Sequence, residues 1–192
     1  RGRTTAAALG VAALLGAGLV AGQAFAAAPG AMTTTATTAA TATDSEVAAA
    51  LAFSREEERM ARDLYAALAA RYDGARPFST ITRSEQRHFD AIGTLLDQYD
   101  VADPSAGKTA GTYAIPAVQA LYDGWLKDGK ASLDAAYQVG VELEKRDIAD
   151  LEKTIADDLP ADVDAVLGRL LNGSRNRLAA YERAVDGNLG TG

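Results

Sequence analysis

Four side chains of this sequence, Glu57, Glu85, His88 and Glu144, have the types and spacing to hold a metal ion between helices. Glu85 and His88 stand three residues apart, so on a helix both would converge on one ion. Glu57 and Glu144 each fall at the centre of an apolar helical stripe, and Asp147 lies near the edge of the second of these stripes. Burying an ionised carboxylate is costly unless the group is paired or coordinated. A shared cation would stabilise all of them, and iron or manganese suits mixed carboxylate and imidazole ligands.

Two of these glutamates also fit a purely structural role. Glu57 follows Ser54 at the spacing of a capping box, in which the glutamate closes the start of a helix. Glu85 follows Thr82 at the same spacing. His88, taken alone, would be an ordinary core histidine. The metal hypothesis therefore depends on the coincidence of several inward-facing ligands and not on any one of them.

The composition excludes several function classes. The 192 residues include no Cys and one His, which rules out disulfides, zinc–thiolate sites, iron–sulfur clusters, Cys nucleophiles and a two-histidine metal site built from one chain. The 26 acidic and 19 basic residues give a formal charge of −7, which makes binding to nucleic acid a poor hypothesis. We therefore expect a metal ion, and no nucleic acid, as a partner.

The first 46 residues predict export and a tether. A basic start, an apolar run over 6–20 and the small-x-small sequence at 24–26 follow the order of a secretory signal peptide, residues 1–26. A membrane anchor is the alternative, but this run is short and interrupted by Gly. Residues 27–46 are dominated by Thr and Ala and predict a flexible linker. We expect the mature protein to be secreted or to lie in the cell envelope, with no membrane segment.

The remaining residues, 47–188, predict one all-α domain. Helical periodicity and boundary signals indicate four long helices, over about 54–72, 82–99, 132–158 and 162–186. The connection over 100–131 is long and predicts a short helix of its own, over 116–127. Two antiparallel hairpins joined by one long crossover define the ferritin-like four-helix bundle. We expect a monomer or a homodimer.

Several local strings, taken together in order, resemble one known family. They are EEERMARDLY at 56–65, SEQRH at 84–88, LYD at 121–123, GVELEKRDIADL at 140–151 and GSRNRL at 173–178. This combination resembles the ferritin-like family catalogued as domain of unknown function 2202, over about residues 47–186. The resemblance implies a bundle related to rubrerythrin-type folds with a metal site between the helices. It implies no particular activity, because the family is defined without one.

The chain departs from this family at Arg177, where the family pattern has His. The resemblance therefore carries Glu57, Glu85, His88, Glu144 and Asp147 over as metal ligands but supplies no imidazole from the fourth helix. A guanidinium has no lone pair for a metal. In one hypothesis Arg177 replaces one cation beside Glu144 or Asp147 and leaves a single metal at Glu85 and His88. In the other the site is a metal-free network of arginine and carboxylates.

These hypotheses lead to two functions. The first is an exported ferritin-like protein with a mononuclear or weakened iron or manganese site and a redox role. If this is an enzyme, it is a di-metal type of oxidoreductase with an incomplete site. The second is a structural or interaction bundle at the cell envelope, without metal and without catalysis. A hydrolase is disfavoured, because the sequence has no nucleophile elbow.

Overall fold

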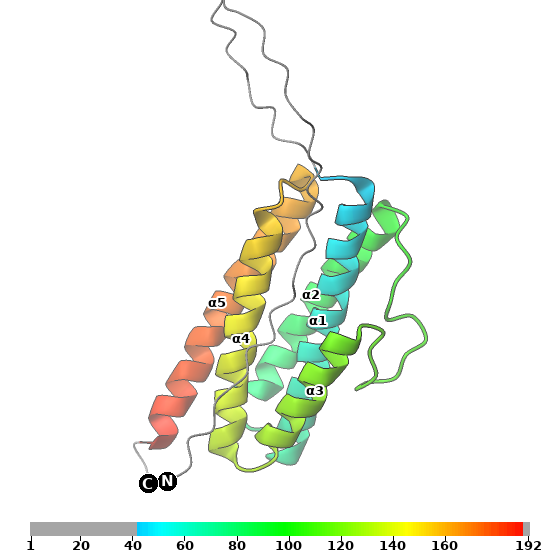
Figure 1. Ribbon diagram of the computed structural model, residues 1–192. Helices are drawn as coiled ribbons and strands as arrows, with labels where there is room; N and C mark the ends of the chain where they lie inside the picture. The colour runs from blue at the N-terminus through cyan, green and yellow to red at the C-terminus, as the bar shows by residue number, and fades with distance from the viewer. Residues whose placement is uncertain (1–41, 190–192) are drawn as a thin grey trace, which may run out of the picture. The chain divides into compact units, whose positions relative to one another are not determined.

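The computed structural model describes residues 42–189, and within them the chain is entirely helical (Figure 1). The helices are α1 Asp44–Arg71, α2 Phe78–Gln98, α3 Pro116–Gly129, α4 Leu133–Ile155 and α5 Ala161–Leu189. The prediction of an all-α fold is confirmed, and the short helix of the long connection lies where the sequence predicts it. The predicted signal peptide, and residues 27–41 of the predicted linker, lie outside the described residues.

The helices form two pairs with a short fifth helix beside them. Helix α1 packs mainly on α2, and α4 packs mainly on α5, each pair being joined by a short connection. The crossover between α2 and α3 runs along one side of the bundle, and α3 packs on both α1 and α4 (Figure 1). None of the helices in the described residues combines the length and apolar character that a bilayer crossing requires.

Helix α1 begins at Asp44 and not near Ser54. Its N-cap is Thr43, whose backbone N–H donates to Glu46 Oε2 at 2.7 Å while the Thr43 side chain accepts from the Glu46 N–H. The predicted Ser54–Glu57 capping box is therefore wrong. The Ala-rich segment before Ser54 has a high helix propensity without a clear apolar period, so it extends the helix. Glu57 lies in the middle of α1 as a result.

The capping role predicted for Glu85 is also wrong. Helix α2 begins at Phe78, and Thr82 lies one turn inside it, where its hydroxyl donates to the Phe78 carbonyl at 2.9 Å. The backbone N–H groups near Glu85 are already bonded within the helix, so the carboxylate has no helix start to cap. Some other group must stabilise its charge, because Glu85 is fully buried.

A polar layer divides the interior into two apolar clusters. The first cluster lies at the α3 end and contains Tyr65, Phe78 and Tyr181. The second lies at the opposite end and contains Ile92 and Leu167, among others. Apart from Asp63, the buried polar residues of each long helix fall between the residues of the two clusters. The polar layer is thus held between two well-packed cores, which restricts the movement of its side chains.

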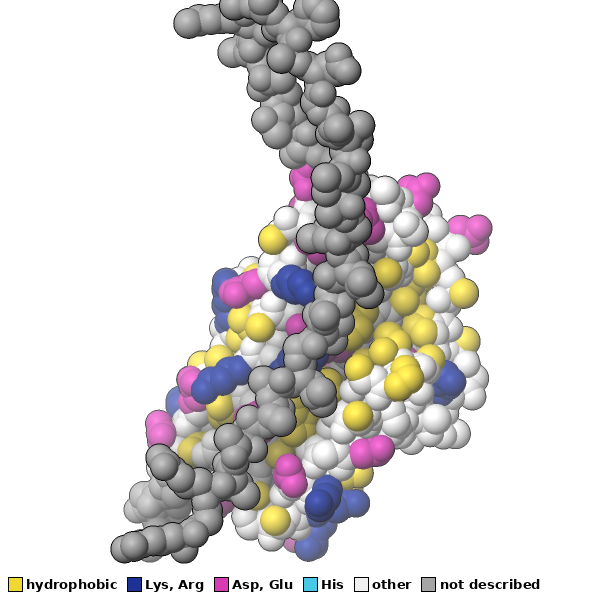
Figure 2. Space-filling view, viewed as in Figure 1, with side chains coloured by type: hydrophobic (Ala, Val, Ile, Leu, Met, Phe, Trp, Pro, Cys, Tyr) yellow, Lys and Arg dark blue, Asp and Glu magenta, His cyan; other side chains and the backbone are white. Residues whose placement is uncertain are grey.

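The described part of the face in Figure 2 is not strongly basic. Within the described part of the face in Figure 2, Lys and Arg side chains are interspersed with Asp and Glu. This mixture agrees with the acidic balance of the sequence and gives nucleic acid no extended cationic surface on that side.

Truncating one residue of each apolar cluster should destabilise the bundle strongly. Leu64 and Ile92 are both fully buried, one in each cluster. We expect Leu64→Ala and Ile92→Ala each to lower the free energy of unfolding by about 2–5 kcal/mol, because each leaves a cavity. Denaturant unfolding measures this, with Gln138→Ala on the exposed face of α4 as the control. A negligible loss at both positions would show that these side chains are not core residues.

Candidate metal centre

All four long helices contribute buried polar side chains to the layer. The residues are Glu58 from α1, Glu85 and His88 from α2, Glu144 and Asp147 from α4, and Ser174 and Arg177 from α5. All are buried except His88, whose side chain is 13% exposed. Four carboxyl groups therefore share this interior space with one guanidinium and one imidazole.

Three of these residues could hold one metal ion. One potential ligand atom each of Glu58, Glu85 and His88 lies within 4.8 Å of the other two. His88 Nδ1 lies 3.2 Å from Glu58 Oε2 and 3.6 Å from Glu85 Oε2. The i,i+3 spacing on α2 brings Glu85 and His88 together, as the sequence predicts, and α1 supplies the third ligand.

The carboxylates of this trio lack the hydrogen bonds that their burial demands. Among the described residues, no group donates a hydrogen bond to either oxygen of Glu85 or to Oε1 of Glu58. Leaving buried polar atoms unsatisfied costs roughly 1–3 kcal/mol each, and more for charged groups. A cation between them would satisfy these oxygens, so the donor set fits a metal ion that accepts carboxylate and imidazole.

Arg177 lies beside both Glu85 and His88, with its Nη1 3.3 Å from His88 Nδ1, and it also neutralises the remaining carboxylates. Its Nε donates to both oxygens of Glu144 at 3.1 Å and is also 2.9 Å from Glu85 Oε1, without hydrogen-bond geometry to Glu85. Its Nη2 reaches Asp147 Oδ2 at 3.5 Å. The prediction that Arg177 pairs with Glu144 or Asp147 is matched here at both residues. One guanidinium thus bridges α5 to α2 and α4.

Neighbouring hydroxyl groups orient the carboxylates around Arg177. Tyr65 O–H donates to Glu144 Oε1 at 2.8 Å, and Ser174 O–H donates to Asp147 Oδ2. Arg177 Nη2 in turn donates to Ser174 Oγ at 2.9 Å. The half of the layer around Arg177 is therefore well satisfied, in contrast to the half around His88.

Burial shifts the proton affinities of the whole layer. Burial raises the pKa of Glu58, Glu85 and Glu144 well above the ordinary range, and the nearby Arg177 opposes this rise. Burial also raises the pKa of Asp147, again opposed by Arg177. For His88, burial and the Arg177 charge together lower the pKa to about 4. His88 is therefore neutral near pH 7 and keeps a lone pair. In this structure Arg177 Nη1 faces the ring nitrogens at 3.3 Å and 3.4 Å, so a metal would take the place of this contact.

Glu57 lies outside the Glu58–Glu85–His88 trio, although the sequence analysis places it at the centre of its stripe. Its Oε1 is 3.8 Å from Arg146 Nε, and its carboxyl shares a small pocket with Glu58 and Asp147. On a helix Glu58 lies about 100° away from Glu57 and so off the centre of the stripe, yet Glu58 is buried and belongs to the trio. Of the residues predicted as ligands, Glu85 and His88 are the two that the structure brings into this trio.

Helical periodicity does not identify Glu58, because other parts of the fold cover α1 on several sides. Three consecutive glutamates, 56–58, are all buried, which a helix with a single apolar face does not allow. Glu56 is covered by the crossover, where its carboxylate accepts the N–H groups of Ala114 and Ile115, the latter at 3.1 Å, and the hydroxyl of Ser105 at 3.1 Å. The one sequence signal for this buried segment is the run of charged residues at 55–59. Only the long-range contacts in the structure show that these residues are buried.

Gly173 of α5 leaves the space that the His88 imidazole occupies. A Cβ at Gly173 would lie 2.7 Å from His88 Cε1 and Nε2 and 2.9 Å from Arg177 Nη1. Gly173→Ala should therefore push the imidazole out of its buried position and raise its pKa from about 4 toward the ordinary 6.5. Because the chain has one His, an NMR titration of the imidazole reports this directly.

Gly168→Ala is the matched control, because the same substitution there on the same helix meets no atom within 4 Å. It should leave the His88 pKa unchanged. An unaltered His88 pKa in Gly173→Ala would mean that α5 does not determine where the imidazole lies.

The fold and this buried layer place the chain in a class of all-helical proteins whose interior carries acidic and imidazole groups. Within that class the chain belongs to the family described as "Uncharacterized protein domain (DUF2202)", which it matches over residues 47–191. It is 37% identical over 132 residues to uncharacterized protein MJ0754 of Methanocaldococcus jannaschii, covering 69% of this chain and 71% of the relative.

A solved structure agrees with this assignment. The crystal structure of hypothetical protein MJ0754 from Methanococcus jannaschii is similar with a TM-score of 0.73 and 36% identity, over 76% of this chain and 82% of that chain. The resemblance to the family is therefore confirmed, and it extends to the fold of a relative.

Proposed function

We propose that this protein is a ferritin-like four-helix bundle that binds a single iron or manganese ion at Glu58, Glu85 and His88. One observation carries the proposal: Glu58 and Glu85, two buried carboxylates from different helices, keep oxygens without hydrogen bonds beside a neutral imidazole. Such a group of atoms is stabilised by a cation that accepts oxygen and nitrogen ligands.

The connectivity supports the ferritin-like part of the proposal. The pairs α1–α2 and α4–α5 have short connections, whereas α2 and α4 are separated by a long crossover that includes α3. In ferritin-like bundles such a crossover joins two antiparallel hairpins, and facing helices direct carboxylates and histidines into the core. The polar layer midway along the long helices has that position.

The residues of the layer have two roles in this proposal: some would hold the ion, and Arg177 neutralises the other carboxylates. His88 offers a lone pair, while Glu58 and Glu85 offer charge, so these three would hold the ion. Arg177 neutralises Glu144 and Asp147 and keeps them from competing for it. When bound, iron or manganese would supply one-electron redox chemistry, which is the redox role that we propose.

Export belongs to the same proposal. The basic start, the apolar run and the sequence at 24–26 are what support it, together with the Thr- and Ala-rich segment that follows. The mature protein would begin near Ala27 and be secreted or held in the cell envelope. Mass spectrometry of the protein from its native source tests this, and an uncleaved chain in the cytoplasm would contradict it.

Metal titration by calorimetry tests the metal site. The metal-free parent should bind about one Mn²⁺ or Fe²⁺ per chain, and Glu85→Gln should abolish this binding because it removes a ligand charge. Glu142→Gln, on the exposed face of α4, is the control and should bind like the parent.

A metal-free structural domain is the second candidate. The observation that favours it is the contact of Arg177 with three carboxyl groups, which neutralises part of the layer without any metal. A parent protein that binds neither ion under anaerobic conditions would support this candidate and exclude the first.

A further inference from the structure

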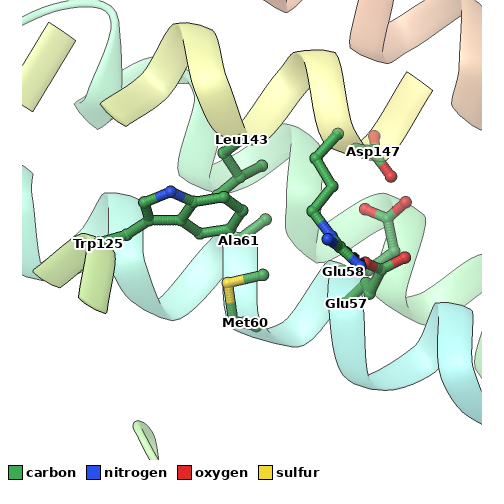
Figure 3. A pocket seen from close by; sticks show the side chains of 8 residues that line it. Glu57, Glu58, Met60, Ala61, Trp125, Leu143 and Asp147 are labelled. Carbon is green, nitrogen blue, oxygen red and sulfur yellow. Dashed lines mark ion pairs between the residues drawn. The ribbon is translucent and has the colours of Figure 1, made fainter. Parts of the chain in front are cut away.

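A narrow pocket is lined by Glu58, one member of the buried trio, and by the partly exposed side chain of Arg146. Its volume is about 10 Å³, which is room for a single water molecule. Glu57, Glu58 and Asp147 lie close together at one end of it, and Trp125 of α3 lies at the other (Figure 3). The pocket therefore ends at Glu58, the trio residue whose Oε1 has no hydrogen-bond donor among the described residues.

The charged groups at the carboxylate end of this pocket differ in exposure. The side chain of Arg146, which lines the pocket, is 42% exposed, and that of its partner Asp150 is 27% exposed. The side chains of Glu57, Asp147 and Glu58 are only 9%, 11% and 3% exposed. A cation entering there would meet these three carboxylates, and the one positive charge among the residues lining the pocket is that of Arg146.

Arg146 is held in place by weak contacts. Its Nε lies 3.1 Å from Asp150 Oδ2 and 3.8 Å from Glu57 Oε1. Neither contact has hydrogen-bond geometry, since Asp150 Oδ2 has no hydrogen-bond partner among the described residues. A long, half-exposed side chain held by charge alone exchanges rotamers within nanoseconds. The guanidinium can therefore swing away without disturbing the helices.

We propose that this pocket is the route by which a divalent cation reaches the buried trio, with Glu57 and Asp150 attracting the ion and Arg146 closing the route. This inference rests on the proposed metal site. In the closed state the pocket is too small for a hydrated ion, so the ion passes only when Arg146 leaves its two carboxylate partners. The incoming cation competes with the guanidinium for those carboxylates and so helps to displace it.

Rapid mixing of the metal-free full-length protein with Co²⁺ tests the route. Trp125 lines the pocket and is the single Trp of the chain, so quenching of its fluorescence reports arrival of the ion, with the visible absorption of bound Co²⁺ as a second signal. Competition with a chelator gives the dissociation rate. Calorimetry on the same samples gives the stoichiometry.

Removing the guanidinium of Arg146 and removing the charge of Glu57 should change the association rate of Co²⁺ in opposite directions. Arg146→Ala should accelerate both association and dissociation by about tenfold, and Glu57→Gln should slow association by about tenfold, the scale on which charge affects such rates. Stoichiometry should stay unchanged in both. A merely structural disturbance would shift both variants in the same direction. Arg175→Ala, which removes an exposed pair with Glu152, is the matched control and should behave like the parent.

The possible failures are distinguishable. If the parent binds Co²⁺ at the trio but Arg146→Ala and Glu57→Gln keep the parental rates, the route is wrong and the metal site stands. If Glu57→Gln loses the bound ion altogether, Glu57 is a ligand and the gate is again wrong. If the parent binds no Co²⁺, Mn²⁺ or Fe²⁺, the proposed function fails and the route fails with it.

Discussion

Arg177→His is expected to bind a second divalent metal ion, in addition to the one at Glu58, Glu85 and His88. The guanidinium lies between Glu85, Glu144 and Asp147, at 2.9–3.5 Å from an oxygen of each. Removing it frees carboxylate oxygens on α2 and α4, and the introduced imidazole supplies the nitrogen ligand that arginine lacks. Calorimetric titration with Mn²⁺ should change from about one to about two ions per chain.

The metal-free form of this variant should also be less stable than the parent. Removing one partner of a buried ion pair typically costs about 3–5 kcal/mol, because the other charge is left uncompensated. Metal that binds only the folded state should reverse part of the loss, by about 2.7 kcal/mol at a metal concentration one hundred times the Kd. Thermal unfolding with and without Mn²⁺ measures both effects.

Arg177→Gln separates the two causes, because glutamine removes the charge without adding an imidazole ligand. It should be destabilised like Arg177→His yet bind no second ion. Equal stoichiometry in the parent and in Arg177→His would show that Arg177 does not take the place of a metal. Its role would then be confined to pairing with the carboxylates.

The stability of the metal-free protein should fall as the pH rises. Burial raises the pKa of Glu58, Glu85 and Glu144 well above the ordinary value of 4.5. The folded chain then holds protons that the unfolded chain has released. This contribution to stability is fully present below pH 4.5 and is lost as the pH rises through the raised pKa values.

His88 acts in the opposite direction over a lower pH range. Its pKa is lowered from 6.5 to about 4, so its contribution is present above pH 6.5 and is lost as the pH falls toward 4. About one pH unit above 6.5 and higher, His88 is neutral in both states, so the carboxyl groups are the part of the layer that changes there. Denaturant unfolding in a chelator, between about pH 7.5 and 9, isolates their effect.

With metal bound, the stability of the folded protein should rise with pH instead of falling. The ligands must lose their protons to bind, so the apparent affinity for Mn²⁺ should rise about tenfold per pH unit for each proton displaced. Comparing calorimetric heats in buffers of different ionisation enthalpy counts those protons. An affinity that is independent of pH, or that falls as the pH rises, would show that these carboxyl groups do not hold the ion.

The helices of the second half of the domain could be predicted well, because their boundary signals are local. Ser132 caps α4 by accepting the Ala135 N–H at 3.0 Å, and Pro116 occupies the first turn of α3. The start of α1 could not be predicted, because an alanine-rich run extends a helix without leaving a periodic pattern. The capping-box spacings Ser54–Glu57 and Thr82–Glu85 lie inside α1 and α2 and predict helix starts that the structure does not have.

The candidate site could be predicted only in part, for a different physical reason. Glu85, His88 and Arg177 lie on stripes that face the bundle core, so periodicity reveals them. The charged run at 55–59 is buried by segments distant in the sequence: Arg55 lies over the Phe89 ring and pairs with Asp103, and Arg59 donates to the Thr112 carbonyl at 2.8 Å. Local periodicity contains no information about such partners, so it does not identify Glu58 as a buried residue of the site.

The most direct test of a single buried ion is an anomalous difference map from crystals of the parent protein grown with Mn²⁺ or Fe²⁺ and measured at the absorption edge of that metal. The proposal predicts one strong peak inside the bundle, between the carboxylates of Glu58 and Glu85 and the imidazole of His88, with Arg177 still paired to Glu144. An interior without a peak, or a peak that displaces Arg177 from Glu144, would contradict it.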